Sequence, residues 1–476
     1  MKPHISLLLL FFIIFTVPFY AQVGIGTTNP DPSAALDISS TDGGMLTPRM
    51  TTAQRTAIAS PATGLLVFDT DLDLFYYFDG AIWQPLGSAE IRDNYKLVKD
   101  ISDLSDEFSG GSYVLNTDYL YEINGSITVD APIDLNGAYI EGVDVSEDIL
   151  INASGGTLFT GSVGGSLRNI TIDGNGSSIF DLTGGTLVLN NSVMVGSSSL
   201  GNLDGLDLAF FSITQYVNNG DGFTVTDVDS YFMSNSFWTE TNTGTFLDLN
   251  GTFSNIQMAN GRIVVNSGET GLDVSANPSI NNEASLSGIS FVGNGDFVNG
   301  YTTGTYPGYN FTVEWYVNCS GLLNETHELA NADFYYDGVI TTGFTQTISN
   351  GTAVEIQAPA IDYGSDKLFR FRIEGNGNRM VYEGTIERSF QIVASLSVRV
   401  TNASGDFYGF TIAKNGVPLE RSNAVVRIDN DSQIQSISLN AVIDLTTDDY
   451  IEIYVQRLTG SFTDTLVVFS ESVSIK

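Results

Sequence analysis

The chain has 476 residues and a formal net charge of −36, from 55 Asp and Glu against 19 Lys and Arg. Such a negative field repels nucleic acid and anionic lipid, since binding either needs a clustered positive patch. Hydrophobic residues make up 42% of the chain, which excludes a disordered protein. The 49 glycines, with many Phe and Tyr, favour short strands joined by tight turns.

The first 21 residues have the pattern of a secretory signal peptide. Lys2 precedes an apolar run from Ile5 to Val17, and Ala21 supplies a small residue for cleavage. The run is shorter than the roughly 20 residues that cross a bilayer. We therefore expect a secreted protein, extracellular or at the cell surface, with no membrane span after signal cleavage.

Residues 22–90 predict a small N-terminal attachment module. A short polar helix is expected around Thr51–Ala59, and Gly64–Gly87 has the pattern of a β-hairpin or meander that turns at Asp79 and Gly80. Isolated hairpins are only marginally stable, so this module needs partners, either the next zone or copies of itself.

A connector with a short helix is expected at 91–110, followed by a solenoid at 111–300. Phe-containing segments recur at Phe159, Phe180, Phe223 and Phe246, which corresponds to coils of about 21–23 residues. Asn-Gly and Asp-Gly pairs suit the corners of such coils. The pattern favours a right-handed parallel β-helix of eight or nine coils; the competing interpretation is a pair of β-sandwiches.

Beyond residue 300 the period ends. A small β region is expected at 301–348 and a head domain at 349–476, where long alternating strands such as Ser389–Val400 predict a β-sandwich or jelly roll. Cys319 is the only cysteine, so no intrachain disulfide can form. We expect Cys319 to be a small buried hydrophobe rather than a reactive thiol. The fold class is therefore all-β.

The N-terminal module resembles a module common in secreted, fibre-like proteins of Bacteroidetes. The resemblance covers about 65 residues and depends on five segments: Val23–Pro30, Ala35–Ser39, Leu46–Ile58, Pro61–Asp71 and Phe75–Leu86. In related chains this module often precedes sequence like that of phage tail fibres, and the resemblance says little about biochemical activity.

Two further stretches resemble bacteriophage tail-fibre and tailspike proteins. The first is Tyr113–Val143, where the solenoid begins; the second combines Asn378–Val398, Phe410–Leu419 and Leu445–Gln456, and is similar to the tumour-necrosis-factor-like jelly roll of many trimeric fibres. The resemblance implies a homotrimer with a β-helix shaft and a jelly-roll tip. Because a virion fibre assembles in the cytoplasm, the signal peptide favours a bacterial exported relative.

Carboxylates in the solenoid are the candidates for catalysis. A glycosidase needs two of them, and stacked coils could place Asp227 or Asp229 beside Glu240 or Asp248. Three aromatic residues nearby, Tyr231, Phe237 and Trp238, could form a platform for sugar. The alternative is that these Asp residues form turns by bonding their own backbone and that the aromatics fill the core.

The sequence indicates no cofactor. The DTDLD segment, Asp69–Asp73, is superficially similar to a calcium loop, so calcium is possible, but the segment lacks the Gly and distant Glu of an EF-hand.

We therefore expect a fibre-like surface protein, a homotrimer with a structural or adhesive role, which binds a surface glycan or protein and is not an enzyme. Two alternatives stay open: a tailspike-like glycan hydrolase that uses solenoid carboxylates, and an architectural component of an extracellular filament or injection apparatus.

Overall fold

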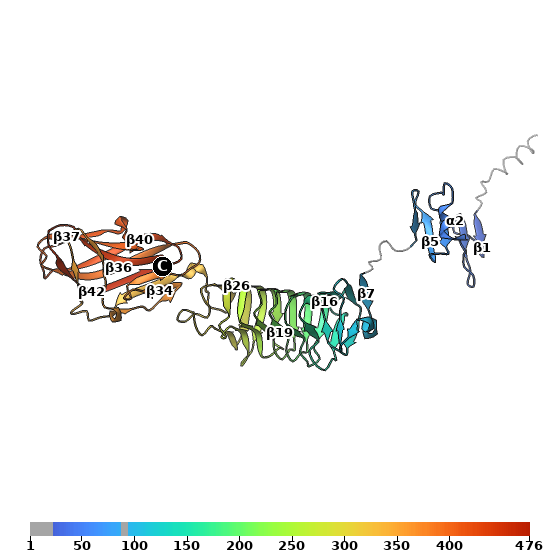
Figure 1. The fold of residues 1–476 in the computed structure, drawn as a ribbon, viewed down its shortest axis with the longest axis horizontal. Helices are drawn as coiled ribbons and strands as arrows, with labels where there is room; N and C mark the ends of the chain where they lie inside the picture. Colours follow the sequence, from blue (N-terminus) through green and yellow to red (C-terminus); the bar gives the residue numbers. More distant parts are fainter. Residues whose placement is uncertain (1–21, 87–93) are drawn as a thin grey trace, which may run out of the picture. The chain divides into compact units, whose positions relative to one another are not determined.

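The computed structural model describes residues 22–86 and 94–476; the predicted signal peptide lies outside the described residues. The chain divides into two compact units, Met1–Asp93 and Asn94–Lys476 (Figure 1). In the part of the chain that the structure describes, no helix has the length and apolar character needed to cross a membrane.

The first unit contains a two-stranded parallel sheet, a four-stranded sheet and one short helix. The strands are β1 (Val23–Ile25), β2 (Leu36–Ile38), β3 (Arg49–Met50), β4 (Leu66–Asp69), β5 (Leu74–Phe78) and β6 (Trp83–Pro85). Helix α2 (Thr52–Thr56) begins with a capping box between Thr51 and Gln54, which satisfies backbone N–H groups at its start. The predicted helix and the meander are both present, and Gly80 takes a φ of +105° at the predicted turn.

The second unit begins with a parallel β-helix of about 11 turns, more than the eight or nine expected (Figure 1). The longer of its two sheets has the strand order β28-β26-β24-β22-β20-β18-β16-β13-β10-β7, with β11 and β14 beside this path. Its strands are β7 (Tyr95–Val98), β10 (Leu120–Ile123), β11 (Ser126–Val129), β13 (Tyr139–Glu141), β14 (Ile149–Asn152), β16 (Gly164–Asp173), β18 (Thr186–Val195), β20 (Leu208–Val217), β22 (Ser230–Trp238), β24 (Thr252–Val265), β26 (Ser279–Gly293) and β28 (Trp315–Ser320).

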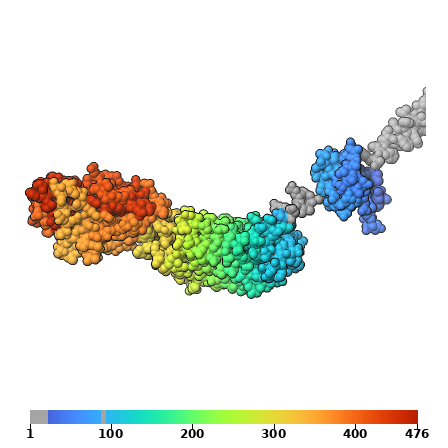
Figure 2. Space-filling model, in the orientation of Figure 1, coloured from blue at the N-terminus to red at the C-terminus, as the bar shows by residue number. Residues whose placement is uncertain are grey.

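The second sheet of the shaft has the order β27-β25-β23-β21-β19-β17-β15-β12-β9-β8. Its strands are β8 (Phe108–Ser109), β9 (Ser112–Val114), β12 (Ile133–Asp134), β15 (Phe159–Gly161), β17 (Phe180–Leu182), β19 (Gly201–Asp204), β21 (Phe223–Thr226), β23 (Thr245–Asn250), β25 (Thr270–Asp273) and β27 (Asp296–Asn299). The coils follow one another in sequence order along the shaft (Figure 2).

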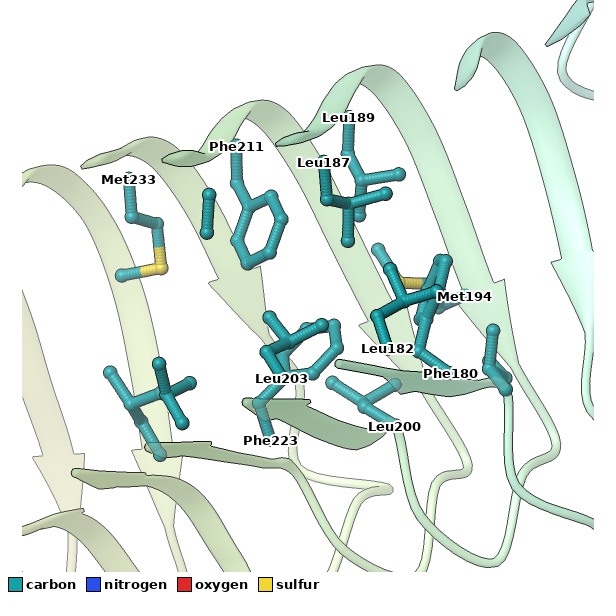
Figure 3. Packing of buried hydrophobic residues seen from close by; sticks show 14 of the residues in the cluster. Phe180, Leu182, Leu187, Leu189, Met194, Leu200, Leu203, Phe211, Phe223 and Met233 are labelled. Carbon is teal, nitrogen blue, oxygen red and sulfur yellow. The ribbon is translucent and has the colours of Figure 1, made fainter. Parts of the chain in front are cut away.

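The spacing of Phe residues corresponds to the stacking of coils. Phe159 is the register partner of Phe180 in the next coil. Gly201, one coil further on, is the register partner of both Phe180 and Phe223. Leu247, not Phe246, is the register partner of Phe223, so this coil holds one residue more than predicted. Phe180, Phe223 and their neighbours point into the shaft, where they pack with Leu and Met from the other sheet (Figure 3).

A row of left-handed residues bends the long strands. Asn169, Asn191, Asn235 and Asn260 have φ values between 47° and 59°, and Asn191 Nδ2 donates to Asn169 Oδ1 at 3.0 Å. Asn tolerates this conformation better than other non-glycine residues. Ile213, at φ +56°, occupies the same place in its coil, where a β-branched residue is strained by about 1–2 kcal/mol.

The C-terminal part of the second unit is a head formed by two antiparallel sheets around one core. One sheet contains β29 (Asn331–Tyr336), β30 (Phe344–Ile348), β32 (Tyr363–Gly364), β33 (Leu368–Phe369), β36 (Arg388–Thr401), β40 (Ile434–Leu445) and β42 (Asp464–Ile475). The other contains β31 (Ala353–Glu355), β34 (Phe371–Glu374), β35 (Arg379–Tyr382), β37 (Asp406–Lys414), β38 (Val417–Pro418), β39 (Ala424–Ile428) and β41 (Tyr450–Arg457). This is a sandwich of the expected all-β class.

Two domain boundaries differ from the expectation. Strand β7, in the expected connector 91–110, is already the first strand of the long shaft sheet, and the short helix there is the 3-10 helix η1 (Ile101–Glu107). The expected separate region at 301–348 is divided, because β28 extends the shaft whereas β29 and β30 belong to the head. These boundaries were missed because the strands concerned are short and carry no detectable repeat of apolar residues, so the sequence does not indicate which sheet each one joins.

Three further 3-10 helices complete the described elements of the second unit: η2 (His327–Leu329), η3 (Ala360–Asp362) and η4 (Glu420–Ser422). Cys319 is 8% exposed within the shaft core, and burial raises the pKa of its thiol to about 11. A thiol with so high a pKa is a weak nucleophile, which agrees with the expected role as a small buried hydrophobe.

Candidate self-association surface and shaft carboxylates

The N-terminal unit exposes an unusual number of large apolar side chains for its size. Val23 and Ile25 of β1 are 53% and 54% exposed, and Leu36 of β2 is 49% exposed. The exposed apolar residues of this unit are Val23, Ile25, Leu36, Ile38, Met45, Leu46, Leu72, Leu74, Phe75, Ile82 and Leu86. Exposed apolar groups that gather on a small unit mark an interaction surface.

The β1–β2 pair cannot be stable without a partner, because two strands alone do not bury enough surface. The loop that connects β1 to β2 is nevertheless held by hydrogen bonds: Asp31 N–H donates to the Asp37 carboxylate at 2.9 Å, and the Ser33 hydroxyl donates to the Asp31 carboxylate at 2.6 Å. Gly26 has a φ of +78°, and a side chain there would meet the Ser39 carbonyl oxygen at 2.0 Å. The GIGTTNPDP segment therefore forms a fixed platform that presents apolar strands.

A buried ion pair holds α2 against the four-stranded sheet. Arg55 Nε lies 2.8 Å from Asp69 Oδ2, and both side chains are almost fully buried. The guanidinium also lies 3.8 Å from the centre of the Tyr76 ring. Burial would raise the pKa of Asp69, but hydrogen bonds from Arg55 and Thr52 outweigh it and lower that pKa. The pair thus fixes the frame that carries the exposed apolar side chains.

Asp69 is also the first residue of the segment considered for calcium. Its oxygens already accept hydrogen bonds from Thr52, Arg55 and the Asp71 N–H. Across residues 22–86 and 94–476 there is no group of three or more acidic, His or Cys side chains placed to hold a metal ion. Asp69 of this segment therefore serves the internal ion pair, and the sequence offered no sign that Arg55 would be its partner.

The four carboxylates predicted as catalytic candidates are not gathered in one place. Asp227 and Asp229 lie at the corner before β22, where they accept hydrogen bonds from the next coil: Thr252 N–H donates to Asp227 at 2.8 Å, and the Ser254 hydroxyl donates to Asp229 at 2.5 Å. Glu240 is exposed beyond the other end of β22. The fourth, Asp248, lies on β23 in the second sheet.

Asp248 instead has a different carboxylate beside it. It is in register with Asp273 on the adjacent strand β25. Burial raises the pKa of Asp248, and the charges of Asp273 and Asp221 add to this effect. Burial would also raise the pKa of Asp273, but hydrogen bonds from Asn299 and Ser275 outweigh it and lower that pKa. Sequence spacing did not reveal this pair, because the register depends on the exact length of one coil.

The aromatic residues considered as a sugar platform divide between core and surface. Tyr231 and Trp238 are at most 1% exposed and pack inside the shaft, whereas Phe237 is 43% exposed. Trp238 packs on Phe246, with ring centres 5.2 Å apart. Two of the three residues therefore fill the core.

Comparison with known families matches residues 24–102 to the phage tail-like trimerisation region. The match covers the exposed apolar unit and extends into the first coil of the shaft. It supports self-association of this chain as a trimer and a fibre-like protein. No curated protein matches the chain.

Two solved structures show weak similarity. The Eiger TNF of S. frugiperda is 8% identical with a TM-score of 0.20, over 31% of this chain and 91% of its own. Tailspike protein 4 of bacteriophage CBA120, in its enzymatically active domain, is 11% identical with a TM-score of 0.22, over 90% of this chain and 77% of its own. Scores this low carry no argument about shared architecture or activity.

Proposed function

We propose that the chain is a secreted, trimeric, fibre-like surface protein in which the N-terminal module joins three copies, the β-helix forms a shaft and the C-terminal sandwich forms a head. The observation that carries this proposal is the exposed apolar surface of a unit that matches a trimerisation region. Three copies packed through β1 and β2 would bury side chains that a single copy leaves in water, at about 25 cal/mol per Å².

The test is sedimentation of the mature chain, residues 22–476, and of two variants. We expect the unaltered chain to sediment as a trimer. The double variant that combines Ile25→Asp with Ile38→Asp should sediment as a monomer, because association would bury its two new carboxylates between copies. The control is Ile361→Asp, at a head residue that is 91% exposed. It should remain trimeric. A double variant that stays trimeric would show that this surface is not the interface.

The proposal also includes export of the chain and adhesion to a surface. Export is supported by the signal-peptide pattern of residues 1–21. Adhesion to a surface glycan or protein is supported by the head, an antiparallel sandwich whose loops are available for contacts. The same architecture would serve an extracellular filament or injection apparatus, and binding of the mature chain to whole cells separates these roles.

A second candidate function, glycan hydrolysis, is favoured by one observation, the Asp248–Asp273 pair. Neighbouring strands lie about 4.8 Å apart, close to the roughly 5–5.5 Å between the two carboxyl groups of retaining glycosidases. A carboxyl with a raised pKa beside one with a lowered pKa suits an acid and a nucleophile. In this arrangement Asp248 would protonate the leaving oxygen and Asp273 would attack the sugar.

Hydrolysis is tested by the release of reducing ends from a panel of glycans. This candidate predicts release by the mature chain and a loss of about a hundredfold or more in Asp248→Asn. Asp181→Asn is the matched control, because Asp181 is an exposed carboxylate on the same sheet, in strand β17. Equal loss in both variants, or no release from any glycan, would remove the candidate.

A further inference from the structure

A small hollow lies on the outer face of the head sheet that contains β37. Its volume is about 180 Å³, and it is lined by Gly409 of β37 and by the two register partners of that glycine, Gln456 of β41 and Val425 of β39. The residues on either side of Gly409, Tyr408 and Phe410, belong to the head core. Because successive residues of a strand point to opposite faces, the hollow lies on the face that is turned away from the core.

Gly409 is a glycine that the backbone does not require. Its φ lies outside the left-handed region, and a Cβ built on it would have its nearest contacts with the Leu458 side chain, at 3.5 to 3.8 Å. These are ordinary van der Waals distances. A glycine inside a strand costs stability, and it often marks a place where a ligand approaches the backbone closely. The missing side chain leaves the hollow open.

The sides of the hollow are fixed by hydrogen bonds. One side is formed partly by Glu420 of η4, and the Ser422 hydroxyl of the same short helix lies 2.8 Å from the Thr411 hydroxyl of β37. On the other side, Gln456 Nε2 donates to the Gly351 carbonyl oxygen at 2.9 Å. A site that is ordered before its ligand arrives loses less entropy on binding.

The lining offers both kinds of contact that a sugar ring makes. Glu420, Asn423 and Gln456 supply one carboxylate and two amides, which form hydrogen bonds with hydroxyl groups. Val425 and Leu458 are 57% and 42% exposed, and their apolar side chains suit the C–H face of the ring. Among the described residues that line the hollow, Glu420 alone is charged. A neutral sugar is therefore favoured over an acidic one, which Glu420 would repel.

An exposed aromatic residue continues this surface. Phe407 lies two residues before Gly409 on β37, hence on the same face, and it is 41% exposed. Leu458 N–H donates to the Phe407 carbonyl oxygen at 2.8 Å, so Phe407 and Leu458 are neighbours in the sheet. A saccharide longer than one ring would extend from the hollow onto Phe407.

We propose that the hollow above Gly409 is a carbohydrate-binding site that takes a neutral sugar ring. This inference rests on the adhesive role proposed for the head, and it moves the contact from the loops to a face of the sheet.

The test is binding of the mature chain, residues 22–476, to an array of neutral and acidic oligosaccharides, followed by titration of the neutral saccharide that binds best. Gly409→Val should weaken this binding by about tenfold or more, because the new side chain fills the space of the ring. It should keep or raise the unfolding midpoint of the head, since valine suits a strand better than glycine. Glu420→Gln should weaken binding severalfold. Glu374→Gln, at an exposed glutamate of β34 on the opposite edge of the sheet, should not change it.

Three results would overturn the inference: no binding to any neutral saccharide, unchanged binding by Gly409→Val, or a peptide from a parallel peptide array that loses its binding in Gly409→Val. The last would assign the hollow to a protein partner. If Gly409→Val lowers the unfolding midpoint, Glu420→Gln decides, and undiminished binding by that variant rejects the site.

The proposed function is judged separately from this site. A trimer that binds whole cells but no neutral saccharide overturns the inference alone. A monomer that binds a neutral saccharide and loses it in Gly409→Val overturns the trimer alone. A chain that binds neither cells nor saccharides overturns both the adhesive role and the inference.

Discussion

Removal of the Arg55 side chain is expected to disrupt the N-terminal module and with it the trimer. In Arg55→Ala, Asp69 would remain buried without its cation, which is costly in any fold. The module has only a two-stranded sheet, a four-stranded sheet and one short helix to compensate. We expect at least a tenfold loss of association, equivalent to about 1.4 kcal/mol or more, measured by sedimentation together with Trp83 fluorescence and limited proteolysis.

Two controls make this result specific. Arg49→Ala, on neighbouring β3, removes an exposed cation near Phe68 and should change little. Arg55→Met combined with Asp69→Leu replaces the pair by apolar groups and should restore the trimer, because a buried ion pair can often be replaced in this way. If Arg55→Ala associates as the unaltered chain does, the ion pair does not support the interface.

The head is expected to lose stability as the pH rises through neutrality. Burial raises the pKa of Glu471, on β42, to about 8, while Tyr363 O–H donates to it at 2.8 Å. The unfolded chain releases this proton near the ordinary value of 4.5. Stability from this group is therefore complete below about pH 4.5 and declines up to about pH 8, by at most about 1.4 kcal/mol for each pH unit.

Calorimetry between pH 5 and pH 8 checks this prediction. Burial also raises the pKa of Glu325, from 4.5 to about 7. The stability that Glu325 contributes should likewise decline as the pH rises, over this narrower pH range. Glu471→Gln should flatten the dependence and raise the unfolding temperature at pH 8, whereas Glu387→Gln, at an exposed glutamate, should leave it unchanged. A Glu471→Gln profile parallel to that of the unaltered chain would contradict the prediction.

Much of the fold could be predicted because it depends on repeated local patterns. The recurring Phe residues define coils one at a time, so the solenoid was visible in the sequence. The alternation of apolar and polar residues in segments such as Ser389–Val400 likewise indicated the sheets of the head. The bends themselves were not foreseen, because among Asn169, Asn191, Asn235 and Asn260 only Asn260 belongs to an Asn-Gly pair of the expected kind. Strand β7 escaped notice, since four residues with no detectable repeat do not show which sheet they join.

The candidate site could be predicted less well, because it depends on register and long-range contacts. Asp227 and Asp229 lie at a corner of the shaft and accept hydrogen bonds from the next coil, whereas the alternative interpretation expected them to bond their own backbone. The pairing of Asp248 with Asp273 depends on a coil of 25 residues (273 − 248), which is longer than the predicted period of 21–23. Arg55 and Asp69 lie 14 residues apart in different elements, and neither element alone indicates the other.

The central claim is that three copies of this chain assemble through their apolar surfaces. Its most direct test is the mass of the mature chain, residues 22–476, by sedimentation equilibrium at micromolar concentration. We predict three times the mass of a single chain, unchanged over a tenfold dilution. A single-chain mass at that concentration would contradict the trimer and, with it, the fibre-like function proposed here.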